Sequence, residues 1–278
     1  TGSNHHSSYE QRSRDIICRS SEAFGGNMIA LKDERSIELM ARAGRLLAGL
    51  FQQLPQVITP GVSTHDVDAW IDEELVRRGL VSQSKGYHGY RHASCISVND
   101  AVVHGVPHRR KKIAEGDLVK VDVCAAWKGY CADMARCYFV GEPSKEAQRL
   151  VEAAEAALVQ GIDAARVGNT IGDISFAVQR TVESYGYGIV RDFAGHGIGR
   201  RMHEEPEILN YGTPGRGPAI KAGMAFAIEP MITAAGEDVR VLNDGWTAVT
   251  VDGSLAAHVE DTVVVTQDGP WVITRVEQ

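Results

Sequence analysis

One pattern of helix-start and helix-end residues occurs twice in the sequence, at 60–79 (PGVSTHDVDAWIDEELVRRG) and at 167–186 (VGNTIGDISFAVQRTVESYG). In each copy a hydroxyl residue suited to cap a helix follows a glycine, and another glycine closes the segment. The matching pairs are Gly61 and Gly168, Ser63 and Thr170, Asp66 and Asp173, Val67 and Ile174, Ile71 and Val178, and Gly79 and Gly186. Chance similarity of two helix starts is one explanation. An internal duplication explains more, because each copy follows a longer amphipathic helix and precedes strand-rich sequence.

The elements around the two copies predict the fold class. Apolar residues recur at three- and four-residue steps from Lys32 until Pro55, which predicts the first long helix. A second long helix is predicted near Lys145–Ala165. The segment 117–141 is typical of a hairpin with its turn near Trp127–Gly129. Helices kept apart from mostly antiparallel strands predict an α+β domain.

Composition limits the partners of the chain. A formal net charge of -7 argues against nucleic acid, which needs a basic patch, and we read the basic run Arg109–Lys112 as a solvated turn. No segment reaches the roughly 20 apolar residues of a membrane helix. Five cysteines without a CxxC spacing predict free thiols and a cytoplasmic protein. We expect a flexible N-terminal extension or an added leader at residues 1–27, and a single monomeric domain at 28–278.

Four carboxylates lie in sequence that otherwise predicts apolar strands. They are Asp122 in LVKVDVC, Asp133 in CADMARC, Glu229 in FAIEPM and Glu260 in HVEDTVVV. Acidic residues are poor strand formers, and a buried carboxylate is costly unless it is paired or bound to a metal. One such residue is ordinarily an edge or salt-bridge residue. Four of them in separate strands favour a shared cation.

The predicted hairpin brings two of these carboxylates together. With its turn near Lys128, Asp122 and Asp133 face each other across the strands. Together with His196, the four carboxylates form a hard, oxygen-rich ligand set. Five such side chains hold two divalent ions when some of them bridge, and two ions promote metal-assisted hydrolysis.

The stretch at 193–212 (FAGHGIGRRMHEEPEILNYG) resembles the signature of the type I methionine aminopeptidases, which have the pita-bread fold. The segments VDV, ADMA, IEP and VED, which contain the four carboxylates, match the same family in order and spacing, as does VVHGVP. The resemblance runs from about Ile29 to Glu277. It implies a curved antiparallel sheet covered by helices, with an internal pseudo-twofold duplication.

The same resemblance implies a metal centre and a reaction. Asp122 would bind one ion, Asp133 and Glu260 would bridge two ions, and His196 and Glu229 would complete the other. Cobalt, manganese, iron and zinc are the candidate metals. The reaction would be removal of the initiator methionine from peptides and nascent chains with a small second residue, with the ribosome as a candidate partner.

Two further histidines and a pocket follow from the resemblance. Glu229 would handle the proton of the attacking water, His203 would hydrogen-bond the scissile carbonyl, and His104 would contact the peptide nitrogen. The residues implied for binding the substrate methionine and its peptide are Tyr87, Tyr90, Cys95, His104, Met202, His203 and Trp246.

The chain departs from the family at several positions beside these residues. Met202 stands where phenylalanine is common, and Cys124 where threonine is common. Met134 and Ala135 replace a Thr-Ser pair, and AAHVE (256–260) replaces a Ser-Ala-Gln type of sequence. These changes put metal preference and turnover in question. Cys124 and Cys131 share strand parity with the two aspartates, so we expect these thiols beside the metals.

Three other functions compete with this interpretation. An aminopeptidase P or prolidase shares the ligands but carries a large additional N-terminal domain, which residues 1–27 cannot supply. A type II methionine aminopeptidase needs a helical insertion between His203 and Glu229, for which the sequence leaves no room. A binding module without catalysis would lose metal ligands, and all five are present.

Overall fold

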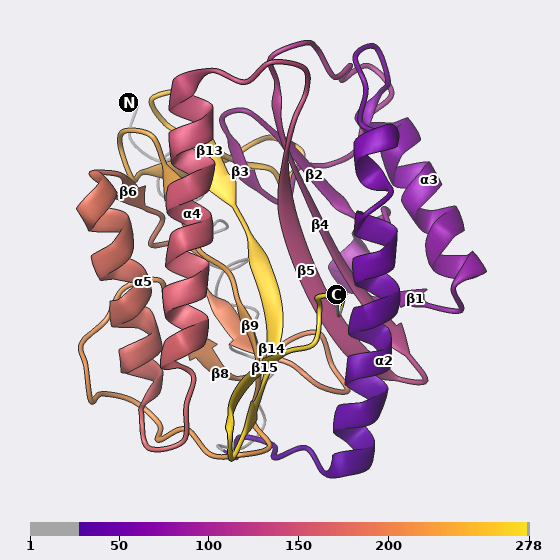
Figure 1. Ribbon diagram of the computed structural model, residues 1–278. Coiled ribbons are helices and arrows are strands. Elements are labelled where there is room, and N and C mark those ends of the chain that lie inside the picture. The colour runs from indigo at the N-terminus through magenta and orange to yellow at the C-terminus, as the bar shows by residue number, and fades with distance from the viewer. Residues whose placement is uncertain (1–27, 277–278) are drawn as a thin grey trace, which may run out of the picture.

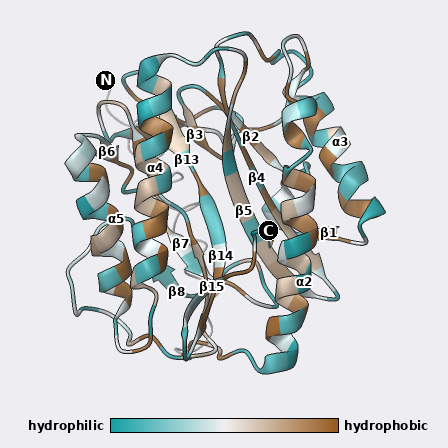
Figure 2. Cartoon of the chain, in the orientation of Figure 1, coloured by the Kyte–Doolittle hydropathy of each residue, from teal (hydrophilic) through white to brown (hydrophobic). Residues whose placement is uncertain are grey.

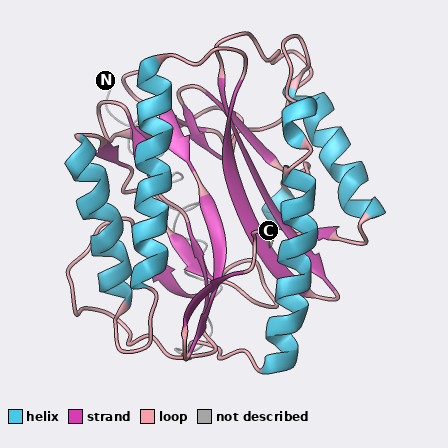
Figure 3. Cartoon of the chain, in the orientation of Figure 1, coloured by secondary structure: helices cyan, strands magenta, loops and turns pink. Residues whose placement is uncertain are grey.

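The computed structural model describes residues 28–276, in which helices cover one face of a curved antiparallel sheet (Figures 1 and 3). The long helices are α2 (Glu34–Phe51), α3 (Thr64–Arg77), α4 (Lys145–Ala164) and α5 (Ile171–Tyr185), and the short 3-10 turns are η1 (Leu54–Gln56) and η2 (Tyr87–Gly89). The predicted α+β class is confirmed. The N-terminal extension predicted at residues 1–27 lies outside the described residues, and no helix among those described is long and apolar enough to cross a bilayer.

The main sheet has nine strands, and its central path runs β1-β4-β5-β14-β9-β7-β8. Its members are β1 (Val81–Ser82), β2 (Cys95–Val98), β4 (Leu118–Trp127), β5 (Tyr130–Phe139), β7 (Gly195–Gly197), β8 (Glu204–Ile208), β9 (Ala225–Ile228), β14 (Glu260–Thr266) and β15 (Gly269–Val272). Two three-stranded sheets adjoin it, one of β6 (Gly188–Ile189), β10 (Met231–Thr233) and β13 (Ala256–His258), the other of β3 (Ala101–Val103), β11 (Val239–Val241) and β12 (Ala248–Thr250). All the pairings are antiparallel. β14 pairs with β5 on one side and with β9 on the other, so it lies between strands from the two halves of the sequence.

The two copies of the helix-start pattern have the same local structure. Ser63 and Thr170 cap α3 and α5, and each forms a capping box with the aspartate three residues later. The glycines that precede the caps, Gly61 and Gly168, have φ of 89° and 98°. A side chain other than glycine rarely adopts this left-handed conformation, which explains why both copies need glycine there. The equivalence supports the predicted duplication.

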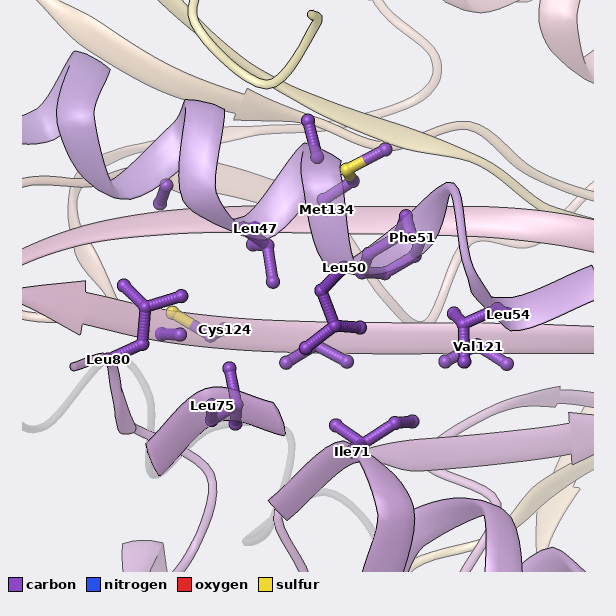
Figure 4. Packing of buried hydrophobic residues seen from close by; sticks show 14 of the residues in the cluster. Leu47, Leu50, Phe51, Leu54, Ile71, Leu75, Leu80, Val121, Cys124 and Met134 are labelled. Carbon is purple, nitrogen blue, oxygen red and sulfur yellow. The ribbon is translucent and has the colours of Figure 1, made fainter. Parts of the chain in front are cut away.

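Each half of the chain has its own apolar core. In the first, α2 and α3 pack on β4 and β5, where Leu47, Leu50 and Ile71 are fully buried (Figure 4). In the second, α4 and α5 pack on β9 and β14 around Leu150 and Ile174. The buried residues of α2 and α4 are almost all apolar. A hydrophilic segment interrupts β14 (Figure 2). The two cores therefore leave a polar region near the boundary between the halves.

The hairpin of β4 and β5 turns at Lys128 and Gly129, both with positive φ, which is the two-residue turn that suits strand twist. The predicted position of the turn is confirmed, but the predicted register is wrong by one pair. Asp122 lies opposite Ala135, and Asp133 lies opposite Cys124. The turn is centred between Lys128 and Gly129 rather than on Lys128, so the two aspartates are diagonal neighbours on one face.

Candidate functional site

The face of the sheet away from α2 carries the carboxylates. Side chains alternate along β5, so Met134 packs under α2 whereas Asp133 and Ala135 point to the opposite face (Figure 4). One row crosses β2, β4, β5 and β14, and its members are Cys95, Asp122, Ala135 and Glu260. The small methyl of Ala135 separates two carboxylates in this row, and Asp133 lies diagonal to both.

Glu229 joins these groups from the end of β9. The sequence predicts it inside a strand, but β9 ends at Ile228 and β10 starts at Met231. Pro230 follows Glu229 and has no N–H to donate to a ladder, which explains the break. The carboxylate is thereby placed beside two imidazoles. Its Oε1 lies 3.6 Å from His196 Nε2, and its Oε2 lies 3.1 Å from His258 Nε2.

His196 lies on β7, in register with Ala227 of β9. Its Nδ1–H donates to the carbonyl of Gly197 at 2.9 Å, which leaves the Nε2 lone pair facing the carboxylates. Nε2 is 3.9 Å from Asp133 Oδ2. Burial lowers the pKa of His196 to about 4, so the ring is neutral and suited to bind a metal ion at neutral pH.

The carboxyl groups of the site resist ionisation when no ion is present. Burial, with Glu229 nearby, raises the pKa of Asp133 to about 7, and burial raises that of Glu229 to about 8. Burial and the neighbouring Asp133 also raise the pKa of Asp122 and Glu260. A divalent cation counteracts both burial and the repulsion between neighbouring carboxylates. It takes the place of solvating water, and its positive charge stabilises the ionised carboxylates.

Two triads of possible ligands share one residue. The ligand atoms of Asp133, His196 and Glu260 lie within 4.8 Å of one another, and so do those of Glu229, His258 and Glu260. Asp122 contacts Asp133 but belongs to neither triad. Glu260 Oε1 is buried and has no hydrogen-bond partner among residues 28–276. Because an unpaired buried oxygen is costly, this residue fits a position that bridges two ions.

Sequence reasoning missed two residues of the site. His258 is 1% exposed and is the third imidazole of the metal region, and its only signal was the histidine in AAHVE. Thr262 fixes Asp133, because its Oγ1 accepts from Asp133 N–H and donates to Asp133 O, both at 2.8 Å. A threonine in a strand carries no signal of such a role, because threonine is an ordinary strand residue.

The structure also brings His203 and His104 near the carboxylates. The rings of His203 and His196 are edge to face with centroids 4.4 Å apart, and Tyr87 Oη lies 2.8 Å from His203 Nδ1. Burial lowers the pKa of His203 to about 2 and that of His104 to about 4. His104 has φ of 57° and packs edge to face on Phe193 at 5.2 Å. A left-handed backbone conformation costs energy in a residue other than glycine and often marks a functional position.

Two of the predicted pocket residues, Cys95 and Tyr90, lie near Asp122. The rings of Tyr90 and Trp246 are edge to face at 5.0 Å, and Tyr90 Oη donates to Ser94 O at 2.9 Å. Cys95 is buried in register with Asp122. Met202 packs against the first core. The thiol of Cys124 is in register with Asp133 and contacts Cys131, in agreement with the expected position of both thiols.

Comparison with known proteins gives consistent results. The model of metallopeptidase family M24 matches residues 38–267. A methionine aminopeptidase from Clostridium acetobutylicum is 42% identical over 90% of this chain and 100% of its own length. A methionine aminopeptidase from Escherichia coli K12 is 38% identical over 88% of this chain and 94% of its own.

Solved structures agree with these relatives. A methionine aminopeptidase from Thermotoga maritima has a TM-score of 0.88 and 42% identity, and the match covers 90% of this chain and 100% of that one. Prolidase from Pyrococcus furiosus has a TM-score of 0.74 and 24% identity over 90% of this chain and 66% of its own, which shows a shared fold. The predicted pita-bread fold is confirmed by both likenesses.

Proposed function

This chain belongs to metallopeptidase family M24, and from that premise we propose that it removes N-terminal methionine at a centre of two divalent ions. Its activity is hydrolytic, that of a metallo-exopeptidase specific for N-terminal methionine. The observation that carries the two-ion proposal is Glu260, a buried carboxylate shared by two ligand triads with one oxygen unpaired. Cobalt, manganese, iron and zinc all suit this set of carboxylates and imidazoles.

The ligands of the proposed centre are Asp122, Asp133, His196, Glu229 and Glu260. When bound, two divalent ions would polarise the scissile carbonyl and lower the pKa of the attacking water. Asp133 and Glu260 are the proposed bridging ligands of the two ions, because they lie diagonal to each other on adjacent strands. His196 is held by Gly197 with its free nitrogen toward Asp133 and Glu229.

Glu229 is the proposed proton carrier. Its side chain is 13% exposed, so it lies at the accessible edge of the carboxylate group. In the loaded centre a divalent cation would keep this carboxylate ionised, so one of its oxygens can accept a proton and then return it. It would take the proton of the attacking water and deliver it to the leaving amine.

His203 and His104 are the proposed contacts to the scissile peptide. Both rings are neutral at physiological pH because burial lowers their pKa values to about 2 and about 4. Tyr87 Oη and His203 Nδ1 lie 2.8 Å apart, and we assign the hydroxyl as the donor, which would leave the ring proton of His203 on Nε2. That N–H would donate to the carbonyl oxygen as negative charge develops on it. His104 would contact the peptide nitrogen.

The proposed methionine pocket consists of Tyr87, Tyr90, Cys95, Met202 and Trp246. Aromatic rings and sulfur-containing side chains make a polarisable lining for a thioether. The paired rings of Tyr90 and Trp246 support a rigid wall. We propose that the substrates are peptides and nascent chains with a small second residue, met at the ribosome by a cytoplasmic monomer that binds neither nucleic acid nor membranes.

Hydrolysis of two peptides tests this function. Protein stripped with a chelator is supplied with Mn²⁺ or Co²⁺ and given Met-Ala-Ser or Ala-Pro-Ala. Metal-restored cleavage of Met-Ala-Ser alone is expected. Cleavage of Ala-Pro-Ala alone would assign the chain to proline-specific peptidases. Bound metal without cleavage of either peptide would indicate a binding module.

A further inference from the structure

His258 is an imidazole of the centre that the five ligands leave without a role. It ends β13, two residues before Glu260, and is 1% exposed. Its backbone is fixed by pairing with Met231 and by the Cys137 thiol, which donates to His258 O at 3.4 Å. A buried imidazole held in this way has a defined direction.

The ring of His258 points into the carboxylate group. Its Nε2 lies 3.1 Å from Glu229 Oε2, while the other oxygen of the same carboxylate lies 3.6 Å from His196 Nε2. Glu229 therefore lies between two imidazoles. The triads repeat this arrangement around Glu260, since one contains His196 and the other contains His258.

We propose that His258 Nε2 is a sixth protein ligand, which binds one ion together with Glu229 and Glu260. The proposal rests on the two-ion centre proposed above and extends it. Following the two triads, Glu229 is assigned to the ion of His258 instead of sharing the ion of His196, as the family resemblance implies, so each ion has its own imidazole. Two ligands at about 2.1 Å from one ion and at right angles to each other are about 3 Å apart, which matches the pair of His258 and Glu229. The unpaired Oε1 of Glu260 supplies the common ligand.

An additional imidazole changes which metal the centre prefers. Imidazole nitrogen suits zinc, iron, cobalt and nickel, whereas oxygen ligands suit magnesium and manganese. We therefore expect this chain to select Zn²⁺, Fe²⁺ or Co²⁺ over Mn²⁺ more strongly than a centre with a single histidine. This selectivity is a property of AAHVE (256–260), so it belongs to this chain's own sequence.

The test counts imidazoles and ions in the full-length protein. Chelator-stripped protein is titrated with Co²⁺ by calorimetry and visible spectroscopy, and the loaded protein is examined by X-ray absorption. We expect two ions and two imidazoles per chain in the wild type. In His258→Gln, which keeps a side-chain N–H for Glu229, we expect one imidazole, a changed Co²⁺ spectrum and at least tenfold weaker binding of one ion. His108→Gln, at an exposed histidine, is the matched control and should behave as wild type.

The outcomes separate this proposal from the function on which it rests. Two ions with a single imidazole in the wild type would reduce His258 to a hydrogen-bond partner of Glu229. Wild-type binding and spectrum in His258→Gln would lead to the same conclusion. Fewer than two ions in the wild type would instead overturn the two-ion centre. If His258→Gln does not fold, the imidazole count of the wild type still decides, and peptide cleavage is measured separately.

Discussion

At the residue scale, two neighbouring buried carboxylates on β14 have different surroundings, which fit a metal ligand in one case and a structural ion pair in the other. Glu260 and Asp261 point to opposite faces of the strand, and both are almost fully buried. Asp261 accepts from Arg136, Arg275 and Thr274. Glu260 has an oxygen with no partner among the described residues. The carboxylate of Asp261 therefore has its partners within the protein, whereas that of Glu260 is placed to bind a cation.

Exchanging each carboxylate for its amide should give opposite results. Glu260→Gln should stabilise the metal-free protein, because it removes the cost of keeping a buried carboxyl group protonated at neutral pH. It should also abolish binding of two ions, because a shared ligand is lost. Asp261→Asn should destabilise the protein by about 1–3 kcal/mol, because two arginines lose their charged partner, while two ions still bind. Urea unfolding of metal-free protein and calorimetric metal titration measure both effects. Two-ion binding by Glu260→Gln would contradict the assignment of the bridge.

His203 should affect turnover without affecting metal content. We expect His203→Ala to lower kcat on Met-Ala-Ser by about 10²–10³-fold, because a donor to the developing oxyanion is lost. Tyr87→Phe should lower kcat less, because it removes only the hydroxyl that holds His203 in one tautomer and leaves the ring of His203 in place. Metal analysis and steady-state kinetics are the measurements, with His108→Ala as control. Loss of bound metal from His203→Ala would mean that the ring holds the centre together.

The sequence predicts most of the site residues and leaves out His258 for a physical reason. A carboxylate in an apolar strand is costly, so its presence is informative without any coordinates. A histidine in an apolar segment is commonly a satisfied core residue. Its role depends on the direction of the ring and on Glu229, which is distant in the sequence. This contact arises only when β13 pairs with β10, which begins two residues after Glu229.

At the scale of elements, neighbouring strands of one sheet carry most of the proposed ligands, and a glycine allows β7, which carries His196, to approach β8 closely. A Cβ on Gly197, next to His196, would lie 2.1 Å from the carbonyl oxygen of Glu205 in β8. A Cβ on Gly49, inside α2, would meet only the mobile end of the Arg78 side chain at 3.2 Å. The first contact is with backbone and cannot relax without moving a strand.

These two glycines make a matched pair of substitutions. Gly197→Ala should destabilise the metal-free protein by about 1–3 kcal/mol and weaken metal binding, because β7 and β8 must separate. Gly49→Ala should stabilise it by about 0.5–1 kcal/mol, because alanine loses less entropy in a helix. Urea unfolding and Co²⁺ titration measure both. Wild-type metal affinity in Gly197→Ala would show that β7 adapts without moving His196.

Element boundaries follow the sequence where local chemistry decides them. The caps at Ser63 and Thr170 and the turn before Gly129 were predictable because they depend on neighbouring residues. The register of the hairpin was not, since a shift of half a residue in the turn centre moves every pair. The break at Glu229 was signalled by Pro230, which a pattern of apolar residues alone overlooks.

At the scale of the whole molecule, the centre takes ligands from both halves, and its charges affect the stability of the entire fold. Raised carboxyl pKa values contribute stability that is lost as pH rises through the folded values of about 7 for Asp133 and about 8 for Glu229. Lowered histidine pKa values contribute stability that is lost as pH falls below 6.5 toward about 4. Above about pH 7.5 these histidines are largely neutral in both the folded and the unfolded state, so the carboxyl effect then stands alone.

Metal-free protein should therefore become less stable from about pH 7.5 upward, through the folded pKa of about 8 for Glu229. The free energy of unfolding should fall by up to about 1.4 kcal/mol per pH unit for each proton that the folded state retains. With excess Co²⁺ the trend should reverse, because ions bind the ionised carboxylates. Urea unfolding at several pH values is the measurement, and Asp133→Asn should give a flatter profile. A flat profile in the metal-free wild type would mean that the carboxyl groups are already ionised.

The position of β14 also governs when the centre can first exist during synthesis. Glu260 belongs to both triads, yet it lies close to the C-terminal end of the chain and pairs with a strand made far earlier. A growing chain on the ribosome thus exposes its two aspartates, and later His196, long before the shared ligand emerges. Until then the early strands cannot bind a pair of ions. The proposed centre is consequently incomplete until Glu260 has been made, and a product truncated before Glu260 lacks the shared ligand.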